Sequence, residues 1–437
     1  MSLKDILNIV KTDDDNTKDS EKQTIISTTF ITNSDSIKIE ATSHDDSKTP
    51  LVCNFDDSDE LGVPKIKVIG VGGAGNNIID YLEKMRSWPK YVDLWALNTD
   101  KKTLCRLKKK QISANLFLLG ASRLKGFGSG GDPKIGKEAF NENKEELTKI
   151  FVDTDVAFII AGLGKGTGSG AGPQIAKIAK EKGLVTISII TMPSIRIEGE
   201  KTYENAFASK KEFIENCDSV CTIFNDKIVD EISESTFFTQ LEQGNKEIGS
   251  IVSDFVDIIS GAGEINIDFN DLKSFLTGNE SSEGNKAFFH TKIIIDENVK
   301  DFSSLSSLVK EKINKSYSNG DFSSEKIDVL VNFKMGTSNK SDLVVNIKNI
   351  LTDISSSSNI KLVYGIENTL ETFTQISIFI STNEVSNYIP LKQDIQNDEV
   401  NANDKNVLNS SYSAKQAERN KTKNISKLLF DFDEFEK

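Results

Sequence analysis

Short apolar runs alternate with helical patterns through the middle of the chain. Five such runs follow Pro64, at Ile66–Gly70, Val92–Leu97, Val156–Ala161, Leu184–Thr191 and Val220–Phe224. Buried parallel strands read as short continuous apolar runs, and the helices between them cover both faces of the sheet. The pattern therefore predicts a doubly wound α/β domain built on a parallel sheet.

A long helix is predicted after this domain. Its apolar positions recur at helical spacing from Leu241 to Ile259, and Gly261-Ala262-Gly263 is a signal for its end. A second, smaller α/β unit follows. Its predicted strands are Thr291–Ile295, Ile327–Phe333, Lys361–Tyr364 and Gln375–Ile380.

Polar segments flank this region on both sides. Residues 12–60 are rich in Asp, Ser, Thr, Asn and Lys, and such a segment buries too little apolar area to offset its ordering entropy. Beyond Pro390 the composition is again that of a linker. Apolar residues from Ile425 to Phe435 fall on one helical face, which predicts either a frayed helix or a peptide that docks on a partner groove or membrane surface.

Composition narrows the class of protein. The 437 residues carry a formal net charge of −13, which argues against a nucleic-acid binder because such proteins use surplus Lys and Arg to displace counterions. The sequence contains no run of 18 or more apolar residues, so no transmembrane helix is predicted. The first residues lack a signal-peptide pattern. These features predict a cytoplasmic protein. The four cysteines are too scattered for a disulfide framework, and no metal site is predicted.

The first glycine loop, Gly70–Gly75, directly follows a predicted strand and precedes a helix. Glycines allow close approach of the backbone to an anion, and the helix N-terminus presents free N–H groups to a phosphate. The spacing also satisfies the dinucleotide pattern G-x-G-x-x-G. On this loop alone, a nicotinamide-dependent oxidoreductase remains an alternative.

The second glycine loop, Gly162–Pro173, is the stronger signal. It contains six glycines, and Pro173 suits the first turn of the helix that follows. Because each glycine costs roughly 1 kcal/mol of backbone entropy, we expect that packing does not explain them and that this backbone wraps an anion. A Walker P-loop is excluded, since Ile159 stands where glycine is required five residues before Gly164-Lys165.

A third glycine loop, Gly126–Pro133, is also present. Loops at the carboxyl ends of parallel strands meet at one edge of a sheet. We therefore expect the three loops to converge on one ligand, and a nucleotide with two or three phosphates accounts for more than one of them.

Carboxylates follow the long helix at Asp268 and Asp271, close to Asn266. The local interpretation is that Asp268 or Asp271 caps a helix that begins near Leu272. The long helix has about 20 residues and spans roughly 30 Å, so these side chains lie far from the glycine loops of their own subunit. If they do chemistry, it is on the nucleotide of a neighbour.

Residues 64–382 resemble the FtsZ/tubulin superfamily, and FtsZ more closely than eukaryotic tubulin. Six motifs carry the resemblance in the family's order: Gly70–Asn77, Asn98-Thr99-Asp100, Gly128–Pro133, Gly164–Gly170, Asn225-Asp226-Lys227 and the N-x-D-x-x-D pattern of Asn266, Asp268 and Asp271. The resemblance implies a tubulin-like, Rossmann-type GTPase domain with a parallel sheet, a long central helix and a second, smaller α/β domain.

The resemblance also implies GTP/GDP as ligand, with Mg²⁺. Glu198 would contact the ribose, Asn77 and Asn225 would lie near the guanine, and Asn245 would read its edge. Asp268 and Asp271 would polarise the attacking water in the next subunit, with Asn266 facing the nucleotide. The full set assigned to the nucleotide is Gly72, Gly73, Ala74, Gly75, Asn76, Asn77, Asn98, Gly128, Gly130, Gly131, Asp132, Pro133, Gly164, Lys165, Gly166, Thr167, Gly168, Ser169, Glu198, Thr202, Asn225 and Asn245.

The chain departs from the family's pattern at four places. Lys165 stands where the signature has glycine, and Thr202 stands where FtsZ usually has arginine. One hypothesis is that Lys165 replaces the lost charge. Leu241 takes the place of an aromatic residue that stacks on guanine, and the C-terminal segment Leu428–Phe432 lacks the proline of the usual FtsZ tail peptide.

These observations predict the organisation of the whole chain: a disordered extension over 1–63, a GTP-binding domain with the central helix over 64–260, the synergy loop and connection over 261–285, a C-terminal α/β domain over 286–385, a disordered linker over 386–424 and a partner-binding peptide over 425–437.

The expected partners are further copies of the chain, head to tail, and membrane-tethering or division proteins bound by 425–437. The expected function is a filament of the cell division ring that hydrolyses GTP at subunit interfaces. The alternative is a nucleotide-binding scaffold with weak or no hydrolysis and a role outside division.

Overall fold

The computed structural model describes residues 63–231, 236–261, 265–277, 286–295, 302–318, 327–336, 342–354, 360–369 and 371–382. Contacts divide the chain into Met1–Val63 and Pro64–Lys437, and the elements below all belong to the second unit. The extension predicted before residue 63, the linker over 386–424 and the peptide over 425–437 lie outside the described residues.

Six parallel strands form the first part of the sheet. They are β1 (Ile66–Val71), β2 (Val92–Asn98), β3 (Asn115–Leu118), β4 (Val156–Gly162), β5 (Val185–Met192) and β6 (Ser219–Phe224), and they lie in the order β3-β2-β1-β4-β5-β6. All five apolar runs of the sequence are strands. The sequence did not predict β3, because this edge strand has only four residues and none of them is fully buried.

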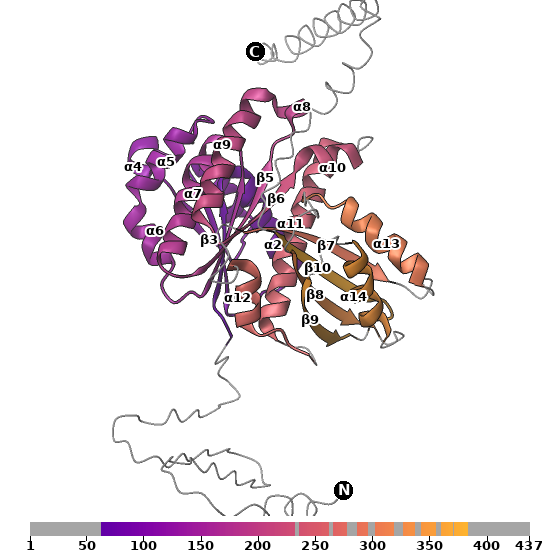
Figure 1. Cartoon of the computed structure of the whole chain (residues 1–437). Helices are drawn as coiled ribbons and strands as arrows, with labels where there is room; N and C mark the ends of the chain where they lie inside the picture. Colours follow the sequence, from indigo (N-terminus) through magenta and orange to yellow (C-terminus); the bar gives the residue numbers. More distant parts are fainter. Residues whose placement is uncertain are drawn as a thin grey trace, which may run out of the picture. The chain divides into compact units, whose positions relative to one another are not determined.

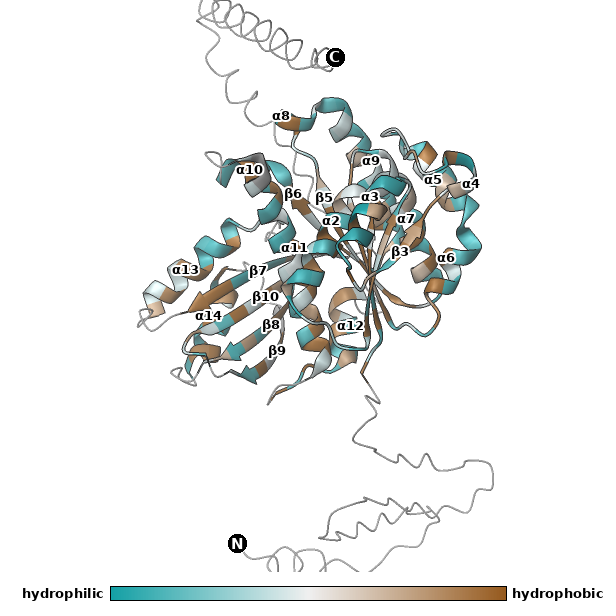
Figure 2. Cartoon of the chain, turned by 180° about the vertical axis from the view of Figure 1, so that it is seen from behind, coloured by the Kyte–Doolittle hydropathy of each residue, from teal (hydrophilic) through white to brown (hydrophobic). Residues whose placement is uncertain are grey.

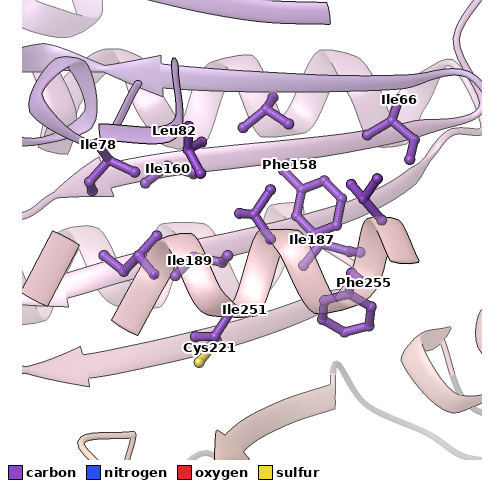
Figure 3. Close-up of a cluster of buried hydrophobic side chains, with 14 of the residues drawn as sticks. Ile66, Ile78, Leu82, Phe158, Ile160, Ile187, Ile189, Cys221, Ile251 and Phe255 are labelled. Atoms are coloured by element: carbon purple, nitrogen blue, oxygen red, sulfur yellow. The ribbon is translucent and has the colours of Figure 1, made fainter. Parts of the chain in front are cut away.

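Helices cover both faces of these strands. They are α2 (Gly72–Met85), α3 (Lys101–Lys109), α4 (Ala121–Leu124), α5 (Pro133–Glu142), α6 (Lys144–Ile150), α7 (Gly166–Glu181), α8 (Ile195–Glu198), α9 (Glu200–Asn216) and α10 (Asn225–Glu231). On one face Ile78 of α2 and Phe158 of β4 share a core with the long helix, as Figure 3 shows. On the other, Ile175 of α7 and Phe213 of α9 pack on Ile159. The doubly wound α/β prediction is confirmed.

The long helix α11 (Phe237–Ser260) follows and ends at Gly261, whose φ of +61° is the left-handed conformation typical of a helix stop. After it come α12 (Phe269–Thr277), β7 (Lys286–Ile295), α13 (Phe302–Asn314), β8 (Ile327–Met335), α14 (Asp342–Ile354), β9 (Ile360–Asn368) and β10 (Thr374–Thr382). Figure 1 shows α11 between the two groups of strands.

The second group of strands continues the same sheet in the order β6-β7-β10-β8-β9. β10 is antiparallel to β7 and β8, while β8 and β9 are parallel. Side chains of α13 and α14 form a core with one face of these strands. The other face packs on α11, where the ring centroid of Phe255 lies 4.3 Å from that of Phe379 and 5.5 Å from that of Phe288. Figure 2 shows the hydrophobic residues concentrated along the strands and hydrophilic residues over helices such as α3.

Within the described part of the chain, no helix has the combination of length and apolar character that crossing a bilayer requires. Cys105, Cys217 and Cys221 are free thiols, and the last two are buried. Cys53 lies outside the described residues.

Candidate functional site

A cavity of about 580 Å³ opens at the carboxyl ends of the parallel strands. The segments after β1, β2, β4 and β5 contribute to its wall, together with residues 128–131 and the first turns of α10 and α11. This edge of a parallel sheet is the usual ligand site, because strand carboxyl ends and helix N-termini meet there. The expected convergence of the three glycine loops is therefore observed at one cavity.

Two helices present uncapped N-termini to this cavity. Neither α2, which follows Val71, nor α7, which follows Lys165, has a side-chain cap or an acidic residue in its first turn. By contrast, Asp100 and Asp132 cap α3 and α5 by accepting hydrogen bonds of 2.8 Å from Lys102 N and Lys134 N. First-turn N–H groups left uncapped can bind an anion, and the helix dipole favours negative charge there.

The glycines of the second glycine loop also have a packing role. A Cβ built on Gly166 would lie 2.0 Å from Ser129 Oγ, one on Gly168 2.4 Å from Gly162 O, and one on Gly170 2.0 Å from Pro133 O. The expectation that packing does not explain these glycines was wrong: α7 approaches β4 and α5 too closely for any side chain. The helix α7 already begins at Gly166, so Pro173 lies inside it, and the prediction that Pro173 belongs to its first turn was wrong.

Buried hydroxyl groups connect the loops behind the cavity wall. Thr167 Oγ1 lies 2.7 Å from Thr99 Oγ1 and 3.2 Å from Ser129 Oγ, so three separate segments share one hydrogen-bonded cluster. Ser169 Oγ accepts a hydrogen bond of 2.8 Å from Gly164 N and fixes the turn before α7. These bonds hold the glycine-rich backbone in a defined shape before any ligand arrives.

Amide and apolar side chains line the other end of the cavity. Asn225 begins α10, and Leu241 and Asn245 lie on the first turns of α11. Leu241 is 43% exposed although it is apolar. An apolar surface beside amide groups suits a flat ring with hydrogen-bonding edges. The neighbouring segment is fixed by Asp226, which is buried and accepts a hydrogen bond of 2.5 Å from Ser194 Oγ.

Comparison with known proteins identifies the family. Residues 65–233 match the model of the Tubulin/FtsZ family, GTPase domain. The cell division protein FtsZ of Buchnera aphidicola subsp. Baizongia pistaciae is 33% identical over 304 residues, which cover 69% of this chain and 74% of that protein. The chain belongs to the tubulin/FtsZ family. The FtsZ of Aquifex aeolicus is 38% identical over 216 residues, 48% of this chain and 56% of that protein.

Solved structures of tubulin/FtsZ proteins show the same fold. An FtsZ dimer from M. jannaschii matches with a TM-score of 0.62 and 26% identity over 74% of this chain and 89% of that chain. CetZ2 from Haloferax volcanii, a GTPγS-bound protofilament, matches with a TM-score of 0.59 over 76% of this chain and 97% of that chain, and its 18% identity makes this a likeness of fold alone. The resemblance inferred from the six motifs is confirmed.

The structure brings most of the residues assigned to the nucleotide together. Those that line the cavity are Gly73, Ala74, Asn77, Asn98, Gly128, Gly130, Gly131, Lys165, Gly166, Thr167, Gly168, Glu198, Asn225 and Asn245. Eight others do not line it, namely Gly72, Gly75, Asn76, Asp132, Pro133, Gly164, Ser169 and Thr202. Asn76, for example, is fully buried and donates to Gly70 O (3.0 Å) and Leu97 O (3.2 Å), so it supports the first glycine loop from behind.

Several lining residues were not among those assigned from the sequence. Thr99, Ser129 and Ser194 contribute hydroxyls, and Gln240 contributes an amide. Thr99 and Ser129 lie inside motifs that the sequence had singled out. Ser194 and Gln240 carry no comparable signal, because only the tertiary fold brings their segments to the cavity.

Lys165 and Glu198 form an ion pair in the cavity wall, with 3.0 Å between Nζ and Oε2. Thr202 is uncharged; its hydroxyl donates to Glu198 O (2.9 Å) and its methyl group faces Gly164. Among the described residues that line the cavity, Lys165 is the single cation.

Asn266, Asp268 and Asp271 lie at the opposite end of α11 from the cavity. None of them lines it, and the part of α11 beyond Ile248, the last residue of this helix in the cavity wall, has 12 residues and is roughly 18 Å long. In Figure 1, α12 and α8 accordingly lie at opposite ends of this unit. Asp268 Oδ1 accepts a hydrogen bond of 2.8 Å from Asn270 N, so the predicted capping role is confirmed for Asp268, although α12 begins at Phe269 and not near Leu272.

Proposed function

We propose that this chain is a GTP-hydrolysing subunit of a head-to-tail filament that acts in cell division. The observation that carries the proposal is the placement of two incomplete sites at the two ends of α11. One end has a cavity with uncapped helix N-termini, and the other has exposed carboxylates. Relatives named cell division protein FtsZ, and neighbours described as a dimer and a protofilament, support the same conclusion.

GTP would bind with its phosphates on the N-termini of α2 and α7. Backbone N–H groups there need no rearrangement, because the hydroxyl cluster around Thr167 already fixes the loops. The base would lie at the other end of the cavity, between Leu241 and the amides of Asn77, Asn225 and Asn245. This arrangement supports GTP or GDP as the ligand and leaves no reason to propose a nicotinamide cofactor.

Mg²⁺ would accompany the nucleotide. In the part of the chain that the structure describes, no group of three His, Cys, Asp or Glu side chains could hold a metal alone. This fits an ion held mainly by phosphate oxygens and water. Asp100 is a carboxylate in the cavity wall that could bind its hydration shell, while Glu198 is paired with Lys165. When bound, the ion neutralises phosphate charge.

Hydrolysis would require a neighbouring subunit. Asp268 and Asp271 are too far from the cavity of their own chain, but both are exposed at the end that would face the cavity of the next subunit. Asp268 fixes the start of α12, and Asp271 in its first turn would orient the attacking water, with Asn266 beside the nucleotide. Phosphoryl transfer to water depends largely on positioning and electrostatics, which these groups would provide.

The remaining assignments complete the proposal. Residues 64–260 would form the GTP-binding domain, 261–285 the connection with the catalytic loop, and 286–385 the second α/β domain. Residues 425–437, after the linker 386–424, would bind membrane-tethering or division proteins and bring filaments to the division site in the cytoplasm.

Replacement of Asp271 by Ala tests the shared active site. Asp342 provides a matched control, because it is also an exposed Asp in the first turn of a helix. We expect Asp271→Ala to form GTP-dependent filaments by sedimentation but to lose about 100-fold or more of its GTPase activity, since an aligned catalytic group is removed. Asp342→Ala should retain both. Normal turnover in Asp271→Ala would refute the shared site.

A second measurement separates polymer-coupled hydrolysis from hydrolysis by single subunits. The specific GTPase activity of the wild type should fall toward zero below the concentration at which filaments appear. Filaments without appreciable turnover would instead favour the second candidate, a nucleotide-binding scaffold with a role outside division, for which the unusual residues Lys165 and Thr202 are the supporting observation.

A further inference from the structure

Lys165 and Glu198 connect two separate walls of the cavity. Lys165 ends the turn before α7, and Glu198 ends the short helix α8. Their charged atoms are 3.0 Å apart, with the Lys165 side chain 73% exposed and that of Glu198 25% exposed. The pair therefore lies where the cavity opens to solvent, between the second glycine loop and the segment after β5.

The two side chains differ in how exposed they are, and the backbone that carries Glu198 is held by hydrogen bonds. Glu198 N donates to Ser194 O (2.8 Å), and Glu198 O accepts from Thr202 Oγ1 (2.9 Å). Ser194 is in turn bonded to the buried Asp226. The Lys165 side chain, by contrast, is mostly exposed and has a flexible four-carbon stem with three donors on its ammonium. When a ligand competes for the pair, Lys165 is the partner that can move.

A phosphate on the N-terminus of α7 would be such a competitor. Lys165 is the residue directly before Gly166, Thr167 and Gly168, whose backbone faces the cavity. A group bound there is within reach of the lysine side chain, and a terminal phosphate carries more negative charge than one carboxylate. Hydrogen bonds from an ammonium to phosphate are among the stronger ones, whereas ion pairs as exposed as this one contribute little to stability.

We propose that Lys165 distinguishes a nucleoside triphosphate from a diphosphate by exchanging Glu198 for the terminal phosphate. With a triphosphate in the cavity, Lys165 leaves Glu198 and binds the third phosphate. With a diphosphate, that anion is absent and Lys165 remains on Glu198. The exchange makes Lys165 a specificity-determining residue, and it rests on the proposed function of the cavity as a GTP site.

The test is a double-mutant cycle in which the measured quantity is the ratio of the affinity for GTP to the affinity for GDP. Dissociation constants for GTP and GDP are measured by titration calorimetry, at protein concentrations below assembly, for the wild type, Lys165→Met, Glu198→Gln and the double variant. Lys165→Met should lower the preference for GTP over GDP about 5-fold, a typical effect of one charge-assisted phosphate contact. A lost ribose contact at Glu198 affects both nucleotides alike and therefore cancels in the ratio.

Glu198→Gln alone should raise the preference for GTP, because it removes the competitor for Lys165. In the Lys165→Met background the same change should leave the ratio unaltered, which a purely structural role of Glu198 would not predict. Lys165→Arg keeps the charge and should keep the preference. Lys201→Met, which removes an exposed cation that does not line the cavity, is the matched control.

The outcomes distinguish this inference from the function on which it rests. Normal binding of both nucleotides, with the same ratio in Lys165→Met as in the wild type, would overturn the exchange and leave the GTP site intact. A wild type that binds neither GTP nor GDP would overturn both.

Discussion

His290 Nε2 lies 2.9 Å from Asp254 Oδ2, and this contact joins β7 to α11 in the interior. Both side chains are buried. Asp254 also accepts hydrogen bonds of 2.7 Å from Lys292 Nζ and Ser377 Oγ, while Glu247 Oε1 is 3.6 Å from His290 Nδ1. Burial favours the neutral ring, but the carboxylates of Asp254 and Glu247 outweigh it and raise the pKa of His290 above 6.5.

Stability should consequently depend on the protonation of His290. Its contribution is complete below the unfolded pKa of about 6.5 and is lost as the pH rises through the higher folded pKa. We expect the free energy of unfolding in urea to decrease as the pH rises from about 6.5 to about 7.5 in the wild type. His290→Gln should flatten this slope.

The measurement stops at about pH 7.5 because two lysines titrate above it. Burial lowers the pKa of Lys210 and of Lys227 to about 8. Parallel stability profiles in the wild type and in His290→Gln would show that another group is responsible.

The close contact between α5 and α7 predicts that a methyl group added at Gly170 lowers the stability of the protein. A Cβ on Gly170 would meet Pro133 O at 2.0 Å and Lys137 N at 2.7 Å, whereas a Cβ on Gly73 would have no atom within 4 Å. Gly170→Ala should therefore destabilise the protein by about 1–3 kcal/mol in urea unfolding, the usual cost of overpacking. Gly73→Ala should stay within about 1 kcal/mol of the wild type. Equal denaturation midpoints for the two variants would be inconsistent with this contact.

Phe127 offers a test of the filament contact. It is 87% exposed in the third glycine loop, between Gly126 and Gly128, and its N–H donates to Leu124 O. A fixed, exposed aromatic side chain beside the cavity would be buried by a subunit stacked on that face. Phe127→Asp should raise the concentration needed for GTP-dependent filaments about tenfold or more, as expected when one buried Phe is lost.

Nucleotide binding by dilute Phe127→Asp should stay close to that of the wild type, because its side chain does not line the cavity. Val345→Asp is the control, since Val345 is 57% exposed on α14, away from the cavity. Light scattering that shows the same critical concentration for both variants would remove Phe127 from the contact.

Much of the fold could be predicted from local pattern. Strands such as β4 are buried on both faces, so their sequences are continuously apolar and easy to recognise. The edge strand β3 lacks that signal because it is partly exposed. The end of α11 was also predictable, since Gly261 takes a left-handed conformation that glycine adopts without strain.

The candidate site was predictable only in part. Glycine-rich loops can be recognised in the sequence. Their close packing cannot, because it depends on which backbone atoms each glycine contacts in the fold, as Gly170 contacts Pro133. Likewise the sequence predicted a phosphate contact for Lys165 but could not reveal Glu198 as its ion-pair partner, because only the fold brings these two side chains together. The helix cap at Asp268 could be predicted from the local sequence, because a short polar side chain precedes an apolar helix there.

Among the described residues, two pairs, Ser219 with Lys286 and Val220 with Ala287, connect β6 to β7 and so make the two groups of strands one sheet. The second group of strands is also attached to α11. Phe255 meets Phe288 and Phe379 in apolar contact, and Asp254 accepts hydrogen bonds from Lys292 and Ser377 and lies against His290. Apolar contacts have no fixed direction, whereas the hydrogen bonds of Asp254 do, so the polar contacts set how these strands lie on the helix. Because the sheet ladder between the two groups of strands is short, α11 carries much of the connection between them, and the same helix extends from the cavity to the segment of Asp268 and Asp271.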